Sequence, residues 1–386
     1  MKKRVSILIA LALVLISCLS LLSGCSNTQK QPPANNPSNS GDTGSPGAQS
    51  TPANDNKVYQ LSLATHDPAT SAKTQYHQEW ARRVNEASGG RLEITVYSDG
   101  VLAPGTGALD ALRTGVCDIA WCMTNYWPGQ FPITEAITLP LGLTNVPQAT
   151  NVLWDLYETE PAYRAELSEF IPLQIHTCPP SIIGTVSKPV YSVSDLAGMK
   201  IRSPGGVPTD SFIAWGATPM QIAPGDIFQA VERGTVDGFC IDFSGIVSFS
   251  LQTVSSYFTD YAVYNPPYYL FMNKSSFERL PADLQDLIMS FSTRKESLEM
   301  AYVYENDVRR GRNAIDEAGG TIIALSDAAA QELRDIAGEV VVSDWIKNNT
   351  TADFDAQAYV DKAASLAQKY FTTTEELYAE LDRQGF

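Results

Sequence analysis

The chain has 386 residues, 44% of them hydrophobic, and a formal net charge of −16 at pH 7. A surface this acidic repels phosphate backbones and anionic lipid headgroups, so we expect no nucleic acid partner. An anionic small ligand would need a locally positive pocket within that negative field, which makes each cation near a candidate site informative.

The first 25 residues have the pattern of a secretory signal. Lys2, Lys3 and Arg4 precede a largely apolar run that ends in "LLSGC", and this ending resembles a lipobox. A lipobox cysteine receives a diacylglycerol and becomes the new N-terminus after cleavage. The apolar run also approaches the length of a membrane span, so a retained helix is the alternative. We expect residues 1–25 to be a lipoprotein signal peptide and lipidated Cys25 to anchor the protein at the extracytoplasmic face of the cell membrane.

The next segment, residues 26–56, contains no aromatic residue, leucine, isoleucine or valine. Such a segment buries too little apolar surface to offset the entropy of ordering, so it predicts a disordered, flexible tether. The remaining body, residues 57–386, is long enough for two lobes. An anchor followed by a tether implies a body displayed outside the membrane.

The body begins with alternating strand and helix patterns. Residues 59–65 alternate between apolar and polar side chains and predict a strand. Residues 72–90 repeat apolar side chains every four positions and end in a glycine pair, which predicts an amphipathic helix. Residues 91–98 predict a second strand, and residues 109–112 belong to a second helix. This βαβα order indicates a parallel sheet with helices on its faces.

Two later features concern the rest of the body. Residues 111–121 and 230–240 share a helix end, a glycine stop, a short apolar pair and an aspartate. The similarity is either a coincidence between two ordinary αβ loops or a sign of two similarly built lobes. Long helical patterns then close the chain, over residues 275–320, 328–348 and 356–371.

Ligands of open α/β sheets bind beyond the carboxyl ends of strands. By this rule the candidate site residues lie where strands stop, at His66 and Asp67, Met123 to Trp127, Arg202, and Phe239 to Phe243. In "GMKIRSPGG" the proline and the glycine pair cannot continue the strand that carries Arg202. A planar, permanently charged guanidinium binds a carboxylate bidentately. The alternative for Arg202 is a structural ion pair with one of 43 acidic residues.

Other candidates also have structural interpretations. His66 is either an exposed turn residue or a hydrogen-bond donor to a ligand. Asp242 is either a helix N-cap or the partner of a ligand amine or a bound cation. Aromatic residues are more often core than ligand contacts, but Tyr126 and Trp127 stand in the turn "TNYWPG". No cluster of oxygen ligands is visible in the sequence, so we expect no metal site and no cofactor.

Four cysteines remain in the body, and none is in CxxC spacing: Cys117, Cys122, Cys178 and Cys240. We expect buried free thiols rather than a disulfide. An enzyme would need a nucleophile, a base and an orienting group, for which Cys178, His176 and Asp237 are imaginable. A cysteine and a histidine two positions apart on one strand do not face each other in that geometry. No nucleophile elbow, P-loop or GxGxxG is present either, so a secreted hydrolase is the less favoured alternative.

Several segments together resemble the solute-binding subunits of TRAP transporters, the DctP-type receptors. They include "GGRLEITVYSDGVLAPGTGALDALRTGVCDIAW", "ITLPL", "LAGMKIRSPGG", "WGATPMQIAPGDIFQAVERGTVDGF" and "ERLPADLQDLIM". The resemblance covers residues 57 to about 320, and residues 196–238 are its most specific part. It implies an α/β, two-lobed periplasmic-binding-protein-like fold with a hinge and long C-terminal helices. Such a receptor closes on an organic acid and delivers it to an ion-driven membrane permease.

The resemblance also implies ligand contacts. Arg202 matches the family's carboxylate-binding arginine. The other candidate contacts are His66, Met123, Tyr126, Trp127, Pro224, Phe239, Asp242 and Tyr268. The chain departs from several family members at Ile182, where they carry a second arginine. We therefore expect a monocarboxylate with an apolar or aromatic body, and a C4-dicarboxylate or a metal–carboxylate complex is the alternative ligand.

The same resemblance implies how the body divides. We expect lobe 1 to comprise residues 57–180 and 267–306, and lobe 2 to comprise residues 181–266 and 307–386. The chain would cross between the lobes near Pro180 and near Pro266, where a hinge would form. The expected partners are a small organic acid, the permease subunits and, through the lipid anchor, the membrane.

Overall fold

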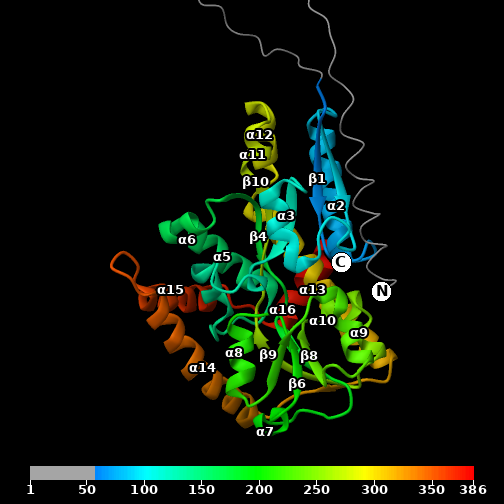
Figure 1. Cartoon of the computed structure of the whole chain (residues 1–386), viewed down its shortest axis with the longest axis vertical. Helices are drawn as coiled ribbons and strands as arrows, with labels where there is room; N and C mark the ends of the chain where they lie inside the picture. Colours follow the sequence, from blue (N-terminus) through cyan, green and yellow to red (C-terminus); the bar gives the residue numbers. More distant parts are fainter. Residues whose placement is uncertain (1–56) are drawn as a thin grey trace, which may run out of the picture. The chain divides into compact units, whose positions relative to one another are not determined.

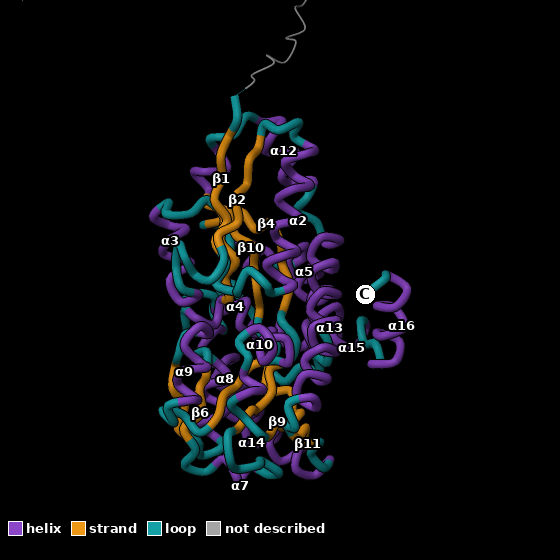
Figure 2. The backbone as a smooth tube through the Cα atoms, turned by 90° about the vertical axis from the view of Figure 1, so that its right-hand side faces the viewer, coloured by secondary structure: helices purple, strands orange, loops and turns teal. Residues whose placement is uncertain are grey.

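Two β-sheets organise the described part of the chain, which covers residues 57–386 of a computed structural model. Figures 1 and 2 show the strands of one sheet above those of the other. The expected signal peptide, the tether and Cys25 lie outside the described residues. The body forms one compact unit by its internal contacts, so the lobe boundaries stay a prediction.

The first sheet has five strands in the order β2-β1-β3-β10-β4. They are β1 (Tyr59–Ala64), β2 (Leu92–Tyr97), β3 (Ile119–Met123), β4 (Phe170–Thr177) and β10 (Pro267–Asn273). β1 pairs in parallel with β2 and β3, but β10 is antiparallel to β3 and β4. The expected parallel sheet is thus correct for three strands only, because β10 follows β9 of the second sheet rather than a crossover helix.

The helices of this half connect or flank those strands. They are α2 (Ala72–Ala87), α3 (Ala108–Thr114), α4 (Pro132–Glu135), α5 (Val146–Thr159), α6 (Pro161–Glu166), α11 (Lys274–Glu278) and α12 (Ala282–Ser290). Gly89 and Gly90 follow α2 at φ +64° and +80°, a left-handed conformation that ends a helix. The strands predicted over residues 59–65 and 91–98 and the helix between them are therefore confirmed.

The second sheet has six strands in the order β11-β9-β5-β8-β6-β7. They are β5 (Ser181–Thr185), β6 (Lys200–Ser203), β7 (Thr218–Gln221), β8 (Gly238–Ile241), β9 (Tyr257–Tyr264) and β11 (Thr321–Ile323). β6 pairs in parallel with β7 and β8, whereas β5 runs antiparallel to β8 and β9. The helices of this half are α7 (Val193–Leu196), α8 (Val207–Ala214), α9 (Ile227–Glu232) and α10 (Phe243–Ser248).

The two sheets contain the same local unit, which explains the similarity between residues 111–121 and 230–240. Each segment leaves a helix and enters a strand, β3 or β8, and in each an aspartate holds the neighbouring parallel strand. Asp118 Oδ2 accepts from Ser62 N on β1 at 2.9 Å. Asp237 Oδ2 accepts from Lys200 N on β6 at 2.8 Å. The similarity therefore reflects two similarly built halves rather than coincidence.

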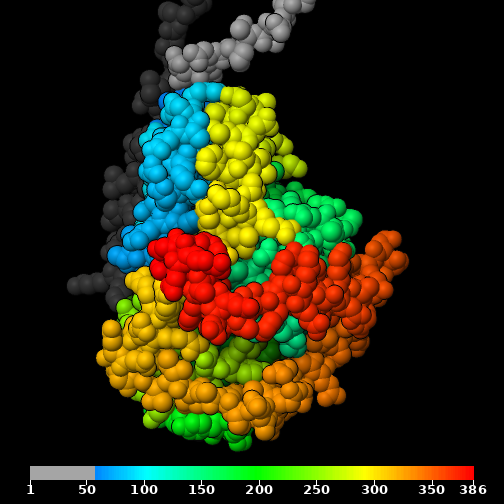
Figure 3. All heavy atoms as spheres, turned by 180° about the vertical axis from the view of Figure 1, so that it is seen from behind, coloured from blue at the N-terminus to red at the C-terminus, as the bar shows by residue number. Residues whose placement is uncertain are grey.

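Four helices at the end of the chain connect the halves. They are α13 (Arg294–Glu317), α14 (Asp327–Asn349), α15 (Ala356–Lys369) and α16 (Thr374–Gln384). α13 packs against α2, α5 and β4 of the first half and against α10 of the second. α14 packs against α8, whereas α15 packs against α5. Figure 3 shows α14, α15 and α16, coloured orange to red, across one face.

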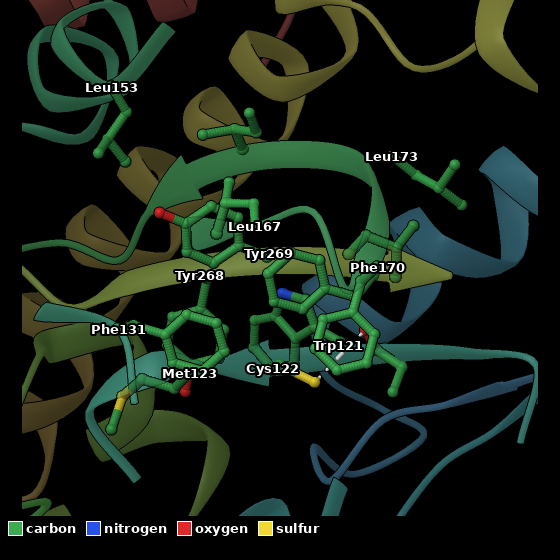
Figure 4. Packing of buried hydrophobic residues seen from close by; sticks show 14 of the residues in the cluster. Trp121, Cys122, Met123, Phe131, Leu153, Leu167, Phe170, Leu173, Tyr268 and Tyr269 are labelled. Atoms are coloured by element: carbon green, nitrogen blue, oxygen red, sulfur yellow. Dashed lines mark hydrogen bonds between the residues drawn. The ribbon is translucent and has the colours of Figure 1, made fainter. Parts of the chain in front are cut away.

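The hydrophobic core follows the same division. The first sheet has one large buried cluster, and Figure 4 shows part of it, including Met123 and Tyr268 from the paired strands β3 and β10. The second sheet is covered by two smaller clusters. Over residues 57–386, no helix combines the length and apolar character needed to cross a bilayer.

Candidate functional site

A cavity lies where the ends of strands from both sheets meet. Its empty space, including the part open to solvent, is about 420 Å³. The residues that line it are His66, Asp67, Lys73, Trp121, Met123, Tyr126, Cys178, Ser181, Arg202, Pro224, Cys240, Ile241, Asp242, Ser244, Gly245, Phe249, Tyr264, Pro266, Tyr268 and Tyr304. Seven of the nine candidate contacts are among them, so the strand-end rule places these side chains around one space.

Arg202 enters the cavity from β6 with its side chain fixed by backbone carbonyls. Its Nε donates to Ile222 O at 2.9 Å, and its Nη1 donates to Cys240 O at 2.9 Å. Its Nη2 is buried and has no hydrogen-bond partner. Arg202 is 2% exposed, and no carboxylate of residues 57–386 lies within ion-pair distance of it. The structural ion pair considered from the sequence is therefore not formed, and a buried positive charge faces the cavity with one donor group unused.

His66 follows β1 and is buried, at 8% exposure, so the exposed-turn interpretation is wrong. Its ring stacks on Trp121 with centroids 5.0 Å apart, and its Nε2 lies 3.5 Å from the hydroxyl of Tyr268. Burial lowers the pKa of His66 and outweighs the opposite effect of Asp67. A neutral imidazole is therefore favoured, which can donate one hydrogen bond to a ligand.

Aromatic rings form one wall of the cavity. The rings of Trp121 and Tyr268 stack with centroids 4.3 Å apart, and Tyr304 stacks behind Trp121 at 6.5 Å. Tyr126 completes this wall from the turn after β3. Burial raises the pKa of Tyr126 to about 12 although the positive charge of Arg202 opposes it, so its hydroxyl stays protonated at neutral pH. The wall offers flat apolar faces with a few hydroxyl groups at their edges.

Asp242 follows β8 and has the N-cap role that the sequence allowed. One of its oxygens, Oδ1, accepts from Ser244 N at 2.8 Å and from Gly245 N at 3.0 Å at the start of α10. Burial raises the pKa of Asp242, and the positive charge of Lys73 opposes that shift. The cap explains why this acid is tolerated in a buried cavity.

Lys73 is the charged cavity residue that the sequence analysis missed. It lies on α2 at 2% exposure, and its Nζ donates to Ser248 Oγ at 2.8 Å. Asp67 and Asp307 lie 3.4 and 3.5 Å from the same nitrogen. Burial by itself would lower the pKa of Lys73. The negative charges of these two carboxylates act in the opposite direction, and the pKa is raised above its ordinary value. The positive charge of Lys73 is thus already neutralised by protein groups.

The signal for Lys73 was present in the periodicity of the first helix. Lys73 shares the buried face of α2 with His77, Trp80 and Val84, which recur at the spacing of one helical face. A lysine on such a face is rarely fully buried without a partner. The sequence therefore contained a reason to expect a buried ion pair there.

Trp127 and Phe239 are not among the residues that line the cavity, and their assignment as ligand contacts stays a prediction. Trp127 is buried and packs edge-on against Tyr126, with centroids 6.1 Å apart. The ring of Phe239 fills the space above Gly184, where an added Cβ would lie 2.3 Å from it. Both side chains belong to buried hydrophobic clusters, Trp127 in the first half and Phe239 in the second.

The catalytic arrangement considered as an alternative is not assembled. Cys178 Sγ donates to Tyr304 Oη at 2.9 Å, and burial raises the pKa of this thiol well above its usual value. His176 Nδ1 lies 3.1 Å from Thr177 O, whereas Asp237 holds the backbone of β6. The four cysteines of the described body are free and buried, as expected. No group of three metal-ligating side chains is found within residues 57–386.

A second cavity, with an empty volume of about 1370 Å³, lies between residues 138–144, β9, α8 and α14. Its acid Asp260 is paired with Arg312 at 2.8 Å, and its cation Arg334 is exposed. A paired acid and a solvated cation give a ligand less electrostatic stabilisation than the buried Arg202. The smaller cavity is therefore the better candidate site.

Comparisons with known proteins show which family and which solved structures the chain resembles. A family model described as DctP, bacterial extracellular solute-binding protein family 7, matches residues 63–348. A TRAP solute-binding protein from Rhodoferax ferrireducens, solved with copurified benzoate, is 26% identical with a TM-score of 0.76, over 81% of this chain and 98% of its own. A marine metagenome TRAP solute-binding protein described as specific for aromatic acid ligands, solved with 3-hydroxybenzoate, is 26% identical with a TM-score of 0.77, over 82% and 100%. A monocarboxylate 2-oxoacid-binding periplasmic protein of Nostoc sp. is 25% identical, over 67% of this chain and 72% of its own.

Proposed function

This chain belongs to the DctP family of bacterial extracellular solute-binding proteins, the receptor subunits of TRAP transporters, and we propose that it binds a monocarboxylate with an apolar or aromatic body. The ligand would lie in the cavity around Arg202, between the two sheets. Receptors of this family are extracytoplasmic and are not enzymes. The proposal concerns the class of acid that this member takes and the residues that hold it.

The observation that carries the proposal is the unpaired charge of Arg202. Burying a guanidinium without a counter-ion is costly, and an anion in the cavity would remove that cost. A ligand carboxylate would accept from the unused Nη2, and charge-assisted hydrogen bonds of this kind are among the stronger ones. The two carbonyls that hold Nε and Nη1 fix the guanidinium in advance, so little entropy is lost on binding.

The charge balance of the cavity favours one carboxylate over two. Lys73 is a second buried cation, but Asp67 and Asp307 already neutralise it. Ile182 occupies the position where several family members have a second arginine, and it is buried in β5 opposite Ile241. A dicarboxylate would therefore leave its second negative charge without a free cation.

The aromatic wall favours a flat apolar body. Trp121, Tyr126 and Tyr268 offer ring faces against which an aromatic ring or a short aliphatic chain would pack. The relatives solved with benzoate and 3-hydroxybenzoate and the 2-oxoacid-binding relative take ligands of this kind by their descriptions. Benzoate, its hydroxylated forms and 2-oxo acids are thus the first ligands to test.

Delivery to a TRAP permease and anchoring through Cys25 complete the proposed function. Two short connections run between strands of the two halves, after β4 and after β9, and Cys178 N of the first donates to Pro266 O of the second at 2.7 Å. Short crossing segments of this kind suit a hinge that closes on a ligand and opens at the permease. Lipidation of Cys25 would keep the receptor at the membrane surface, where the permease is reached quickly.

Calorimetry on the purified body tests the ligand class. We expect measurable binding of benzoate, 3-hydroxybenzoate or a 2-oxo acid, and weak or no binding of succinate and malate. The same titrations with calcium present test the metal–carboxylate alternative. Tight binding of succinate or malate with no binding of monocarboxylates would show that the proposed ligand class is wrong.

A further inference from the structure

The turn after Arg202 passes very close to the other half of the molecule. Gly205 and Gly206 connect β6 to α8 at φ +114° and +62°, a region that favours glycine. An added Cβ on Gly206 would lie 2.3 Å from Oε1 of Glu135, and one on Gly205 would lie 2.8 Å from Asn125 O. Both glycines are therefore required for a close approach between the halves as well as for the turn.

A hydrogen bond is formed at this approach. Val207 N, at the start of α8, donates to Glu135 Oε1 at 3.1 Å. Glu135 belongs to α4 of the first half, and the side chain of Val207 packs into the core cluster of that half. α4 is itself held in place, because Glu166 accepts from Ile133 N at 2.5 Å and from Thr134 N at 2.8 Å. We name the Glu135–Val207 contact, with Gly206 beside it, the lip contact.

The lip contact joins the two segments that carry opposite walls of the cavity. Arg202 stands immediately before the turn, in β6. Tyr126 stands immediately after Asn125, which the turn touches. Figure 2 shows α4 above α8 where the halves meet. A fixed lip contact would therefore constrain the segments next to the guanidinium of Arg202 and next to the aromatic wall.

We propose that Glu135 is a positioning residue for ligand binding, which holds the two walls of the cavity together through the lip contact. The inference rests on the proposed function and adds a residue that touches no ligand. By this inference, the glycine pair of "IRSPGG" allows the close approach of the two halves when the cleft closes.

The charge of Glu135 is not what makes the contact favourable. The charged groups that face it are Asp210 on α8, Asp344 on α14 and Glu166 on α6, and all are acidic. Burial raises the pKa of Glu135, with Asp210 adding to this, and the hydrogen bond from Val207 opposes it. An uncharged acceptor at this position should therefore hold the lip contact at least as well.

The first test compares Glu135→Ala with Glu135→Gln by calorimetry, with benzoate and 3-hydroxybenzoate as probes. Glu135→Ala removes the acceptor and should weaken binding about tenfold, because the loss of one hydrogen bond to a buried acceptor changes affinity by about this factor. Glu135→Gln keeps an acceptor oxygen and should bind as tightly as the wild type. Burial and Asp210 on α8 raise the pKa of Glu135 where the halves meet. We therefore expect closure to take up a proton and wild-type affinity to fall as pH rises through the raised pKa. Glu135→Gln should lose this part of the pH profile, which a merely structural role would not predict.

The second test uses a matched pair of glycines in the same half. Gly206→Ala introduces backbone strain at φ +62° and ψ −153°, a region essentially restricted to glycine, and a clash with Glu135. Gly198→Ala also introduces strain at a positive φ of +74°, but with nothing within 4 Å. Both variants should melt at a lower temperature. Only Gly206→Ala should also lose affinity for the probe acids.

Amide exchange at Val207 in the ligand-free protein tests the contact without any ligand. Glu135→Ala should accelerate this exchange, and Gly198→Ala should leave it unchanged. Unchanged affinity and unchanged exchange in Glu135→Ala would overturn the inference. If the wild type binds neither probe acid, the proposed ligand class fails, and the exchange rates alone then decide whether Glu135 holds the walls together.

Discussion

At the scale of single residues, the cavity is defined by which charges are paired. Lys73 and Arg202 are both almost fully buried, yet only Lys73 has carboxylates beside it. In a buried ion pair the opposite charges balance each other, whereas a buried cation without such a partner needs a counter-ion from outside the protein. This difference makes Arg202 the residue on which the ligand's carboxylate depends.

Arg202→Ala should therefore weaken binding of the acid by about 2–5 kcal/mol, a loss of tens-fold or more, because it leaves the ligand carboxylate unpaired in a buried site. Arg202→Lys keeps the charge but not the planar fork, so it should also bind poorly. Calorimetry with benzoate measures both effects. The matched control is Arg233→Ala, an exposed arginine in the same half. Undiminished affinity in Arg202→Ala would exclude this residue from the site.

At the scale of elements, α13 connects the halves through close packing and a buried acid. Gly311 lies in the middle of this helix, where an added Cβ would lie 2.3 Å from Phe243 O at the start of α10. Nearby, Glu305 accepts from Val146 N at the start of α5 at 2.7 Å. Both features fix α13 against its neighbours, one by the absence of a side chain and the other by a carboxyl group at a helix N-terminus.

Gly311→Ala should destabilise the protein by about 1–3 kcal/mol, because α10 must move away from α13. Gly338→Ala is the matched control in the middle of α14, where the nearest atom to an added Cβ is 3.5 Å away. That substitution should be neutral or stabilising by about 0.5–1 kcal/mol, since alanine favours a helix over glycine. Urea unfolding of the two variants measures the difference. Equal stability changes would contradict the close packing of α10 on α13.

The buried carboxyl group of Glu305 should make the stability of the protein depend on pH. Burial raises the pKa of Glu305 from 4.5 to about 7 in the folded protein. Because the folded state binds the proton more tightly, the stabilisation is complete below pH 4.5 and is lost as pH rises to about 7. Glu305→Gln keeps the acceptor for Val146 and cannot ionise, so it should be more stable than the wild type at pH 8, by on the order of 3 kcal/mol. Urea unfolding of Glu305→Gln and the wild type at pH 4 and pH 8 checks this. The same difference in free energy of unfolding between the two proteins at both pH values would count against it.

At the scale of the body, two similarly built halves are joined by short connections and by α13. Each half has its own sheet and its own hydrophobic clusters. The site lies between them rather than within either one, so the relative position of the halves controls its shape. Ligand binding and closure are then one equilibrium, in which contacts made only in the closed state contribute to affinity.

Solution scattering should show this closure. Saturating benzoate should make the wild-type body more compact, because both halves gain contacts with the same ligand. Arg202→Ala should stay expanded at the same benzoate concentration, which provides the control. An unchanged scattering profile at a concentration where calorimetry shows saturation would contradict the hinge between the connections after β4 and β9.

The sequence by itself determined the elements and the places where strands end. Alternation, helical periodicity and breaker residues act between near neighbours in the chain, so they predicted β1, α2 and β2 and placed Arg202 at a strand end. The resemblance to the DctP family, also visible in the sequence, gave the two-lobed fold.

Only the tertiary structure decided which charges are paired and which rings reach the cavity. Lys73 meets Ser248 and Asp307, which lie 175 and 234 positions away in the chain. Phe239 lies within β8, and the neighbouring strand β5 offers Gly184 as space for its ring. The periodicity of α2 indicates that Lys73 is buried, but it does not indicate which groups Lys73 meets. Packing depends on which distant segment lies opposite a side chain and not on the residues beside it. Arg202 is unpaired for the same physical reason, since only the assembled fold shows that no acid lies opposite it among the described residues.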